Sequence, residues 1–517
     1  MKRIFLFLLP VLSVVYWYVF MRFVPPPPLE ISRETTYFTE LPIKDGKVKL
    51  AAAMNKLRNV PPEDNTAIEL LQIFGENVLA TDSTEVAEFC HLLGVNETFF
   101  ATPTLVLQPM YLASDTSATD TTSKLFFAQQ MQENYRKPWL KEESPEVAAL
   151  IEANTDTFTL LEAMASKNSF FWPYLEKYPL WLSPLSRDFT PNQVLRLLMT
   201  RGMNRLATGD QHGAWHDLVL AGKAGRPLMK SDRIIYALFG LVNMSNVFEA
   251  GVVLLNQKIL ETGLLSQMIK DADELMAIPD LAVALESELR FFQLSHVLEL
   301  DDASALMRQI DQSEGSDTDF SDYSDINVFV RKINRLADSL LPVLQTENVT
   351  NRIKKLKEWV INVDNRREMA STGYGYYVWK ILWIKYLTPA SSKCSEMSEI
   401  ISDVLLNVAV PNYTSMITES LAVKEKFRLL KIAALIKLQR AKTGKFPESL
   451  DELTLTDQQI IQDSFSGERF RFRMEADEIL IYSVGINQHD DEGKTSKYEE
   501  DEEDEEDDDL AIRILKF

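Results

Sequence analysis

The sequence predicts a mainly α-helical protein with an N-terminal transmembrane helix and a small C-terminal α+β unit that contains an antiparallel sheet. Three observations support this prediction. An uncharged apolar run opens the chain, and apolar residues then recur at helical spacing through most of the 517 residues. Near the C-terminus this spacing gives way to alternation, which is the period of a half-buried strand. The length allows about two to four domains.

The apolar run covers residues 4–20 and is rich in Leu, Val, Phe, Tyr and Trp. With the residues up to Val24 it approaches the length that crosses a bilayer. Trp17 and Tyr18 lie near its far end, where aromatic belts form. A cleavable signal peptide is the alternative, but the sequence "MRFVPPPPLE" offers no small-residue cleavage site. We therefore expect residues 1–24 to be an uncleaved signal anchor in the cell membrane.

The charges that flank this run predict its orientation. Lys2 and Arg3 precede it, so the positive-inside rule keeps the N-terminus in the cytoplasm. Arg22 on the other flank weakens this bias. The remainder of the chain is expected to be extracytoplasmic, beyond a stiff polyproline spacer at residues 25–28.

Residues 29–120 predict a small mixed α/β region. "PIKDGKVKL" is typical of a strand with an Asp45-Gly46 turn. Two helical patterns follow, and Gly75 and Gly94 mark their ends because glycine accepts the left-handed conformation that commonly closes a helix.

Residues 121–310 predict a helical body. Pro145 suits the first position of a helix that Ser144 precedes. Pro191 opens an antiparallel helix pair with "TGDQHG" as its turn, and the bulky Trp215 among small residues fits close packing. This pair is similar to one tetratricopeptide-type hairpin, although no 34-residue repeat of it is found elsewhere.

Residues 311–326 predict an acidic linker, because Ser, Asp and Gly dominate "DQSEGSDTDFSDYSD". Its spaced Asp residues suggest an EF-hand, but the Gly at position six and the Glu at position twelve are missing. A second helical region is expected over 327–442. Within it, residues 372–387 are strongly aromatic and predict a buried helix; a ligand-stacking or membrane-surface groove is the alternative.

The last helix of this region has a clear apolar face, and Gly444 follows as its stop signal. The face carries Phe427, Leu430, Ala434 and Leu438. Residues 443–517 then predict a cap in which "RFRFRM" and "ILIYSV" form a hairpin packed on this helix, with "LAIRILKF" as a further strand. An acidic insert at 494–509 interrupts the cap.

The cap resembles the C-terminal half of the type II secretion major pseudopilins, over roughly 95 residues. That family combines a Gly-x-Tyr/Phe-Pro turn, an Asp-containing turn, two short strands and a closing acidic element. The corresponding stretches here are residues 444–447, 463–467, 470–473, 482–487 and 508–512. The cap also resembles a cassette at the ends of large, uncharacterised, membrane-anchored bacterial proteins. The N-terminal processing site of true pseudopilins is absent here, and Ser464 replaces the family's Pro, so filament assembly does not carry over.

The resemblance implies a calcium site in the loop "YSVGINQHDDEG", where the ion fastens the C-terminal strands. The ligands implied by position include one carboxylate of residues 507–509, for which we take Asp508. The full set is Ser483, Asn487, Asp490, Asp491 and Asp508. Calcium prefers six to eight oxygen ligands of this kind. The alternative is a solvated turn, because Asn, Asp and Gly are common turn residues.

The charge distribution argues against nucleic-acid binding. The net charge is -22, and the eleven consecutive acidic residues at 499–509 supply half of it. The rest of the chain is mildly acidic and offers no basic face for phosphates. The acidic run itself is expected to be a solvated, extended segment.

The sequence contains no recognised catalytic motif. His212 and His216 have the spacing of the HExxH zinc motif, but Gly213 stands where its Glu would be and His212 falls in the predicted turn. Cys90 and Cys394 are expected to be separate buried thiols, with a long-range disulfide as the alternative. We therefore favour a non-enzymatic scaffold with an unknown protein partner. An envelope hydrolase with a tertiary-assembled site and an accessory component of a secretion or pilus-like machine are the alternatives.

Overall fold

The computed structural model describes most of the chain. The described residues are 15–16, 19, 24–25, 27–39, 43–44, 47–75, 83–96, 103–105, 129–178, 180, 190–292, 295, 325–371, 380, 383–384, 386–455, 458–495 and 508–517. Within them the protein is mainly helical and ends in a small three-stranded antiparallel sheet, as the sequence predicts. Most of the predicted anchor, residues 311–324 of the predicted linker and most of the acidic insert lie outside the described residues, so these remain predictions. The linker ends one residue earlier than predicted, because Ile326 is already the first residue of a helix that Asp325 caps.

The N-terminal region begins with an antiparallel strand pair, β1 (Ile43–Lys44) and β2 (Lys47–Val48). Strand structure is found where it was predicted, and the predicted Asp45-Gly46 turn lies outside the described residues. Four helical segments follow: α2 (Leu50–Arg58), η2 (Pro62–Asp64), α3 (Ala67–Phe74) and α4 (Ser83–Leu93). Gly75 and Gly94 have φ values of 67° and 72° directly after α3 and α4, as expected for glycines that end helices.

The predicted helical body contains α6 (Pro145–Ala153) and α7 (Thr155–Ala165), which meet at Asn154, and then α8 (Pro191–Ala207) and α9 (Gln211–Gly225). The last two form the predicted antiparallel pair. The Asp210 carboxylate accepts the N–H of Gly213 and caps α9. Asp217 on α9 is fully buried and binds Arg201 on α8 through two hydrogen bonds, of 2.6 and 2.9 Å. This ion pair holds the two helices together.

The chain continues through η5 (Arg226–Lys230), α10 (Ile234–Leu255), α11 (Thr262–Leu275), α12 (Ala282–Ser287) and the π-helical turn η6 (Glu288–Phe292). Within the described part of the chain, α10 alone is long and apolar enough to cross a membrane. It lies mid-chain, and 56% of its most apolar 18-residue stretch is buried inside the structure. These properties fit a central core helix.

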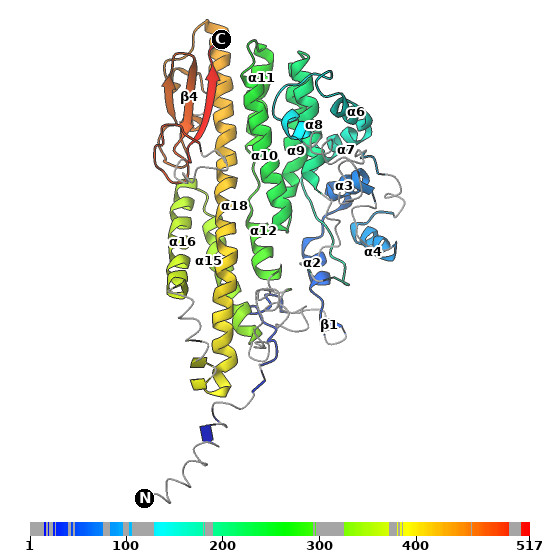
Figure 1. Ribbon diagram of the computed structural model, residues 1–517, viewed down its shortest axis with the longest axis vertical. Coiled ribbons are helices and arrows are strands. Elements are labelled where there is room, and N and C mark those ends of the chain that lie inside the picture. Colours follow the sequence, from blue (N-terminus) through cyan, green and yellow to red (C-terminus); the bar gives the residue numbers. More distant parts are fainter. Residues whose placement is uncertain are drawn as a thin grey trace, which may run out of the picture.

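Three long helices form one side of the molecule: α15 (Ile326–Leu344), α16 (Val349–Ser371) and α18 (Ala390–Thr443). α18 has 54 residues and runs along the body from end to end (Figure 1). α15 and α16 lie beside its lower half, and the sheet lies beside its upper half. It ends where predicted, because Gly444 adopts the left-handed conformation with φ 77° and its N–H bonds to the Arg440 carbonyl.

The C-terminal sheet has the strand order β3 (Arg471–Met474), β4 (Glu478–Ser483) and β5 (Leu510–Leu515), with both pairs antiparallel. Two short helical turns precede it, η8 (Leu450–Glu452) and η9 (Gln458–Ile461). The hairpin and the added strand are as predicted. The sheet packs on α18. Asn256 at the end of α10 also binds β5, since its side chain donates to the Arg513 carbonyl (2.8 Å) and accepts the Leu515 N–H (3.1 Å).

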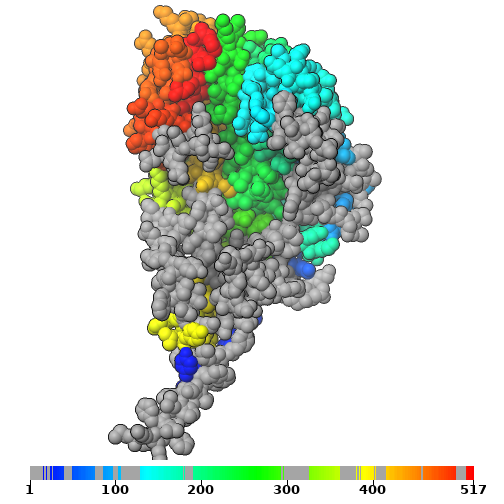
Figure 2. All heavy atoms as spheres, in the orientation of Figure 1, coloured from blue at the N-terminus to red at the C-terminus, as the bar shows by residue number. Residues whose placement is uncertain are grey.

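One continuous cluster of buried apolar residues extends from α3 to β5. Phe427 of α18 packs edge-on against Phe248 of α10, and Ile512 of β5 belongs to the same cluster. On the surface, the orange and red C-terminal residues and the green residues of α10 and α11 form one upper face (Figure 2). The sheet is thus built into the helical body.

Candidate metal centre

The loop that follows β4 is held against the start of β5. Gly485 has φ 63°, and a Cβ atom placed there would lie 2.3 Å from the Asp508 carbonyl oxygen, so only glycine fits this close approach. Asp508 Oδ2 accepts the N–H groups of Ile486 (3.1 Å) and Asn487 (3.0 Å). These contacts bring two segments that are far apart in sequence to one point.

Three carboxylates converge there. Asp491, Asp508 and Asp509 each place an oxygen within 4.8 Å of the others. Asp509 is only 1% exposed, and its Oδ2 accepts the N–H of Gly493 at 2.7 Å. The Oδ1 atoms of Asp508 and Asp509 are both buried, and neither has a hydrogen-bond partner among the residues that the structure describes. Buried anionic oxygens without partners are costly unless a cation or another donor compensates them.

Burial and the closeness of the three carboxylates shift their pKa values. Burial raises the pKa of Asp509 to about 6, and the nearby Asp491 carboxylate adds to the rise. Burial also raises the pKa of Asp508, and Asp491 again adds to it. For Asp491, burial acts to raise the pKa, but hydrogen bonds from His489 and Asn487 outweigh it and lower the pKa. Because burial and like charge disfavour the ionised forms of Asp508 and Asp509, a cation at this point would favour them.

The structure brings some of the predicted ligands together and leaves others apart. Asp491 and Asp508 belong to the cluster, and Asp509 joins them. Asn487 lies beside it, since its Nδ2 donates to Asp491 Oδ2 (3.1 Å) and its Oδ1 accepts the His489 N–H (2.6 Å).

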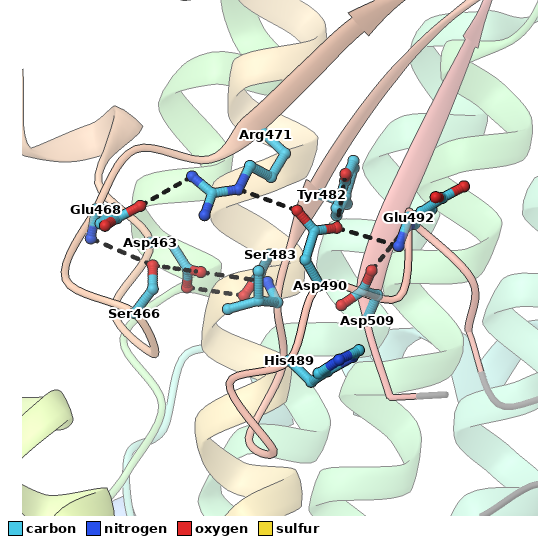
Figure 3. Close-up of polar contacts among 12 residues, drawn as sticks. Asp463, Ser466, Glu468, Arg471, Tyr482, Ser483, His489, Asp490, Glu492 and Asp509 are labelled. Atoms are coloured by element: carbon cyan, nitrogen blue, oxygen red, sulfur yellow. Dashed lines mark hydrogen bonds and ion pairs between the residues drawn. The ribbon is translucent and has the colours of Figure 1, made fainter. Parts of the chain in front are cut away.

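Ser483 and Asp490 have other partners (Figure 3). The Ser483 hydroxyl donates to the buried Asp463 at 2.7 Å. Asp490 accepts hydrogen bonds from the Tyr482 hydroxyl (2.9 Å) and the Glu492 N–H (3.1 Å), and it pairs with Arg471 at 3.4 Å. These two residues hold the loop in shape from outside the cluster.

Asp463 holds the base of this loop in place, a role that the sequence did not single out. It is 1% exposed, and besides Ser483 it accepts the N–H groups of Val484 (3.2 Å) and Phe465 (2.9 Å). It therefore joins the turn before β3 to the end of β4. The signal available was its position at the start of the turn at 463–467. Asp509 lies within residues 507–509, from which the resemblance implied one ligand, and no local signal separates it from Asp507 and Asp508.

Comparison of the chain with protein-family models, curated proteins and solved structures found no match. The pseudopilin resemblance of the cap therefore remains a prediction.

The other candidate residues do not converge. His212 lies in the first turn of α9 rather than in the preceding turn, and its Nε2 lies 3.3 Å from Glu261 Oε2. His216 is also exposed, beside Asp217 at 3.9 Å. Across the described ranges, the three-carboxylate cluster is the one close group of three or more His, Cys, Asp or Glu side chains. Cys90 and Cys394 are buried and form no disulfide, as expected for separate thiols.

Proposed function

We propose that this protein is a membrane-anchored extracytoplasmic scaffold whose C-terminal sheet is fastened by a bound calcium ion. One observation supports the calcium site above all others. Asp508 and Asp509 each keep a buried carboxylate oxygen without a hydrogen-bond partner in the described structure, next to Asp491. We call these three residues the clasp.

The donor chemistry favours calcium. The clasp offers only oxygen atoms, which hard divalent cations prefer, and no His or Cys that would suit zinc. Three carboxylates supply fewer ligands than the six to eight that calcium takes, so backbone carbonyls and water would complete its shell. The ion would join the loop after β4 to the start of β5, and its role would be structural.

The scaffold assignment rests on the long helices and on the predicted anchor at residues 1–24. An extended body of packed helices supplies surface for a protein partner. The anchor places that body outside the cytoplasm at the cell membrane. An N-terminal sequence of the membrane-extracted protein that starts after residue 24 would contradict the anchor.

Hydrogen exchange of the full chain tests the clasp. Calcium should make local opening of residues 484–495 and of β5 rarer, because the ion binds only the form in which the loop is closed against β5. At a calcium concentration of about one hundred times the dissociation constant, the exchange rate there should fall by about a hundredfold. Exchange in α8 and α9 should stay unchanged and serves as the internal reference.

Variants separate the clasp from the acidic run. The double variant Asp508→Asn with Asp509→Asn keeps most of that run and should lose the calcium effect. Asp477→Asn removes one charge from an exposed position near the β3–β4 turn and should retain the effect. Equal exchange in calcium and in chelator would refute the site. A full response in the double variant would assign binding to the acidic run instead.

A further inference from the structure

The chain that leaves the predicted anchor is fixed to the lower end of the long helices. The Cys394 thiol in the first turns of α18 donates to the Val24 carbonyl at 3.6 Å. Asn327 in α15 donates to the Pro28 carbonyl (3.0 Å) and accepts the Glu30 N–H (2.7 Å). The body therefore has a defined end at the point where residues 24–30 meet it.

A short helical segment that contains Trp383, Tyr386 and Leu387 lies at this end. The Tyr16 hydroxyl donates to the Tyr386 carbonyl at 2.7 Å, which brings residue 16 of the predicted membrane segment against the helical residues 383–384 and 386–387. Residues 15 and 16, in dark blue, lie beneath the lower end of α18 (Figure 1), and the space-filling view shows them below the yellow residues there (Figure 2).

This segment presents one apolar face to the surroundings. Trp383, Tyr386 and Leu387 are 61%, 42% and 50% exposed. Their spacing of three and four residues puts them on one side of a helix. The opposite side is buried, since Ile384 and Thr388 are 1% and 2% exposed. The Thr388 hydroxyl donates to the Glu396 carboxylate of α18 at 3.3 Å, which ties the segment to the body. The exposed face is thus fixed in orientation by the body.

We propose that Trp383, Tyr386 and Leu387 rest in the interfacial layer of the membrane beside the anchor. This inference depends on the anchor, and it adds a second contact that sets how the body stands on the bilayer. Trp and Tyr prefer the headgroup level, where the ring is apolar on one side and wet on the other. The bond from Tyr16 puts this face at the depth where the sequence predicts the aromatic belt of Trp17 and Tyr18.

Site-directed fluorescence in lipid tests the contact. The full chain is placed in vesicles of phosphatidylethanolamine and phosphatidylglycerol, with an environment-sensitive dye on one introduced cysteine at a time. Both native thiols are buried, so they compete little for the dye. The variants are Leu387→Cys for the face, Leu12→Cys for the anchor, and Leu140→Cys, an exposed leucine of the helical body, as the control. Quenchers are lipids with a nitroxide at the headgroup or deep in the acyl chain.

The dye at position 387 should be quenched several-fold more by the headgroup nitroxide than the dye at 140. The dye at position 12 should respond most to the acyl-chain nitroxide. If 12 responds while 387 behaves like 140, the interfacial contact is wrong and the anchor stands. If 12 does not respond to lipid nitroxides, the anchor itself is wrong and the contact loses its basis.

Discussion

At the scale of single residues, Glu288 stands out because it is an acid largely enclosed by the core at the first position of the π-helical turn η6. Burial raises its pKa to about 7, and the Arg233 guanidinium opposes the rise without cancelling it. The Arg233 guanidinium makes cation–π contacts with two aromatic rings, at 4.6 Å from the centre of the Tyr174 ring and 5.5 Å from that of the Phe292 ring. Glu288 therefore enters the folded state preferentially as the neutral acid.

This raised pKa predicts a pH-dependent stability. Between the ordinary glutamate value of 4.5 and a pKa of about 7, the unfolded chain loses the Glu288 proton while the folded chain keeps it, so the free energy of unfolding falls as pH rises through this window. Glu288→Gln should remove that loss and stabilise the protein above pH ~7 by on the order of 2 kcal/mol, allowing for its partial exposure. Urea unfolding at several pH values measures it.

Glu274→Gln is the matched control. A hydrogen bond from Lys223 lowers the pKa of Glu274, so its contribution to stability is present above its unfolded pKa and is lost in acid. Its substitution should slightly weaken the protein at neutral pH, opposite in sign to Glu288→Gln. A Glu288→Gln variant whose stability parallels the wild type across the whole range would contradict the assignment.

At the scale of elements, the end of α18 depends on the backbone of one residue. Gly444 has φ 77°, and a Cβ placed there would meet nothing within 4 Å. Gly444→Ala should therefore cost about 1–2 kcal/mol through backbone strain alone. Gly263 in the first turn of α11 is equally open but lacks a positive φ. Gly263→Ala should be neutral or stabilise by about 0.5 kcal/mol. Chemical denaturation of both variants gives the comparison, and equal effects would refute it.

The elements that the sequence predicted correctly are those that depend on local signals. The α8–α9 pair, the helix-ending glycines and the β3–β4 hairpin depend on spacing and turn residues within a few positions, and these were correct. The uninterrupted length of α18 and the π-helical turn at 288–292 have no such local signal. The three-carboxylate cluster could be read from the sequence only in part. Ser483 and Asp490 have the right chemistry, but Ser483 binds Asp463 and Asp490 binds Tyr482 and Arg471. Asp463 and Arg471 come near only when the sheet is folded.

At the scale of the whole molecule, the last strand supports helices that are remote in sequence. Ile512 is 1% exposed and belongs to the same core cluster as α10 and α18. Ile512→Ala should cost roughly 2–5 kcal/mol. Hydrogen exchange should show faster opening at the end of α10, which Asn256 joins to β5, as well as within the sheet.

The neighbouring residue supplies the control. Arg513 is half-exposed and pairs with Glu478 at the surface, so Arg513→Ala should cost under about 1 kcal/mol. If Ile512→Ala loosened the sheet and left α10 unchanged, the sheet and the helical body would be energetically separate.

On the proposed anchoring, the length of α18 would set how far the clasp stands from the lipid. Leu421 of α18 packs with Phe465 and Ile486 at the level of the clasp loop. From Ala390 to Leu421 the helix rises roughly 45 Å at 1.5 Å per residue. The surface potential of an anionic bilayer decays over a Debye length of about 8–10 Å at physiological salt. The clasp would thus sense the calcium activity of the bulk solution, and its occupancy would be independent of the lipid charge beneath it.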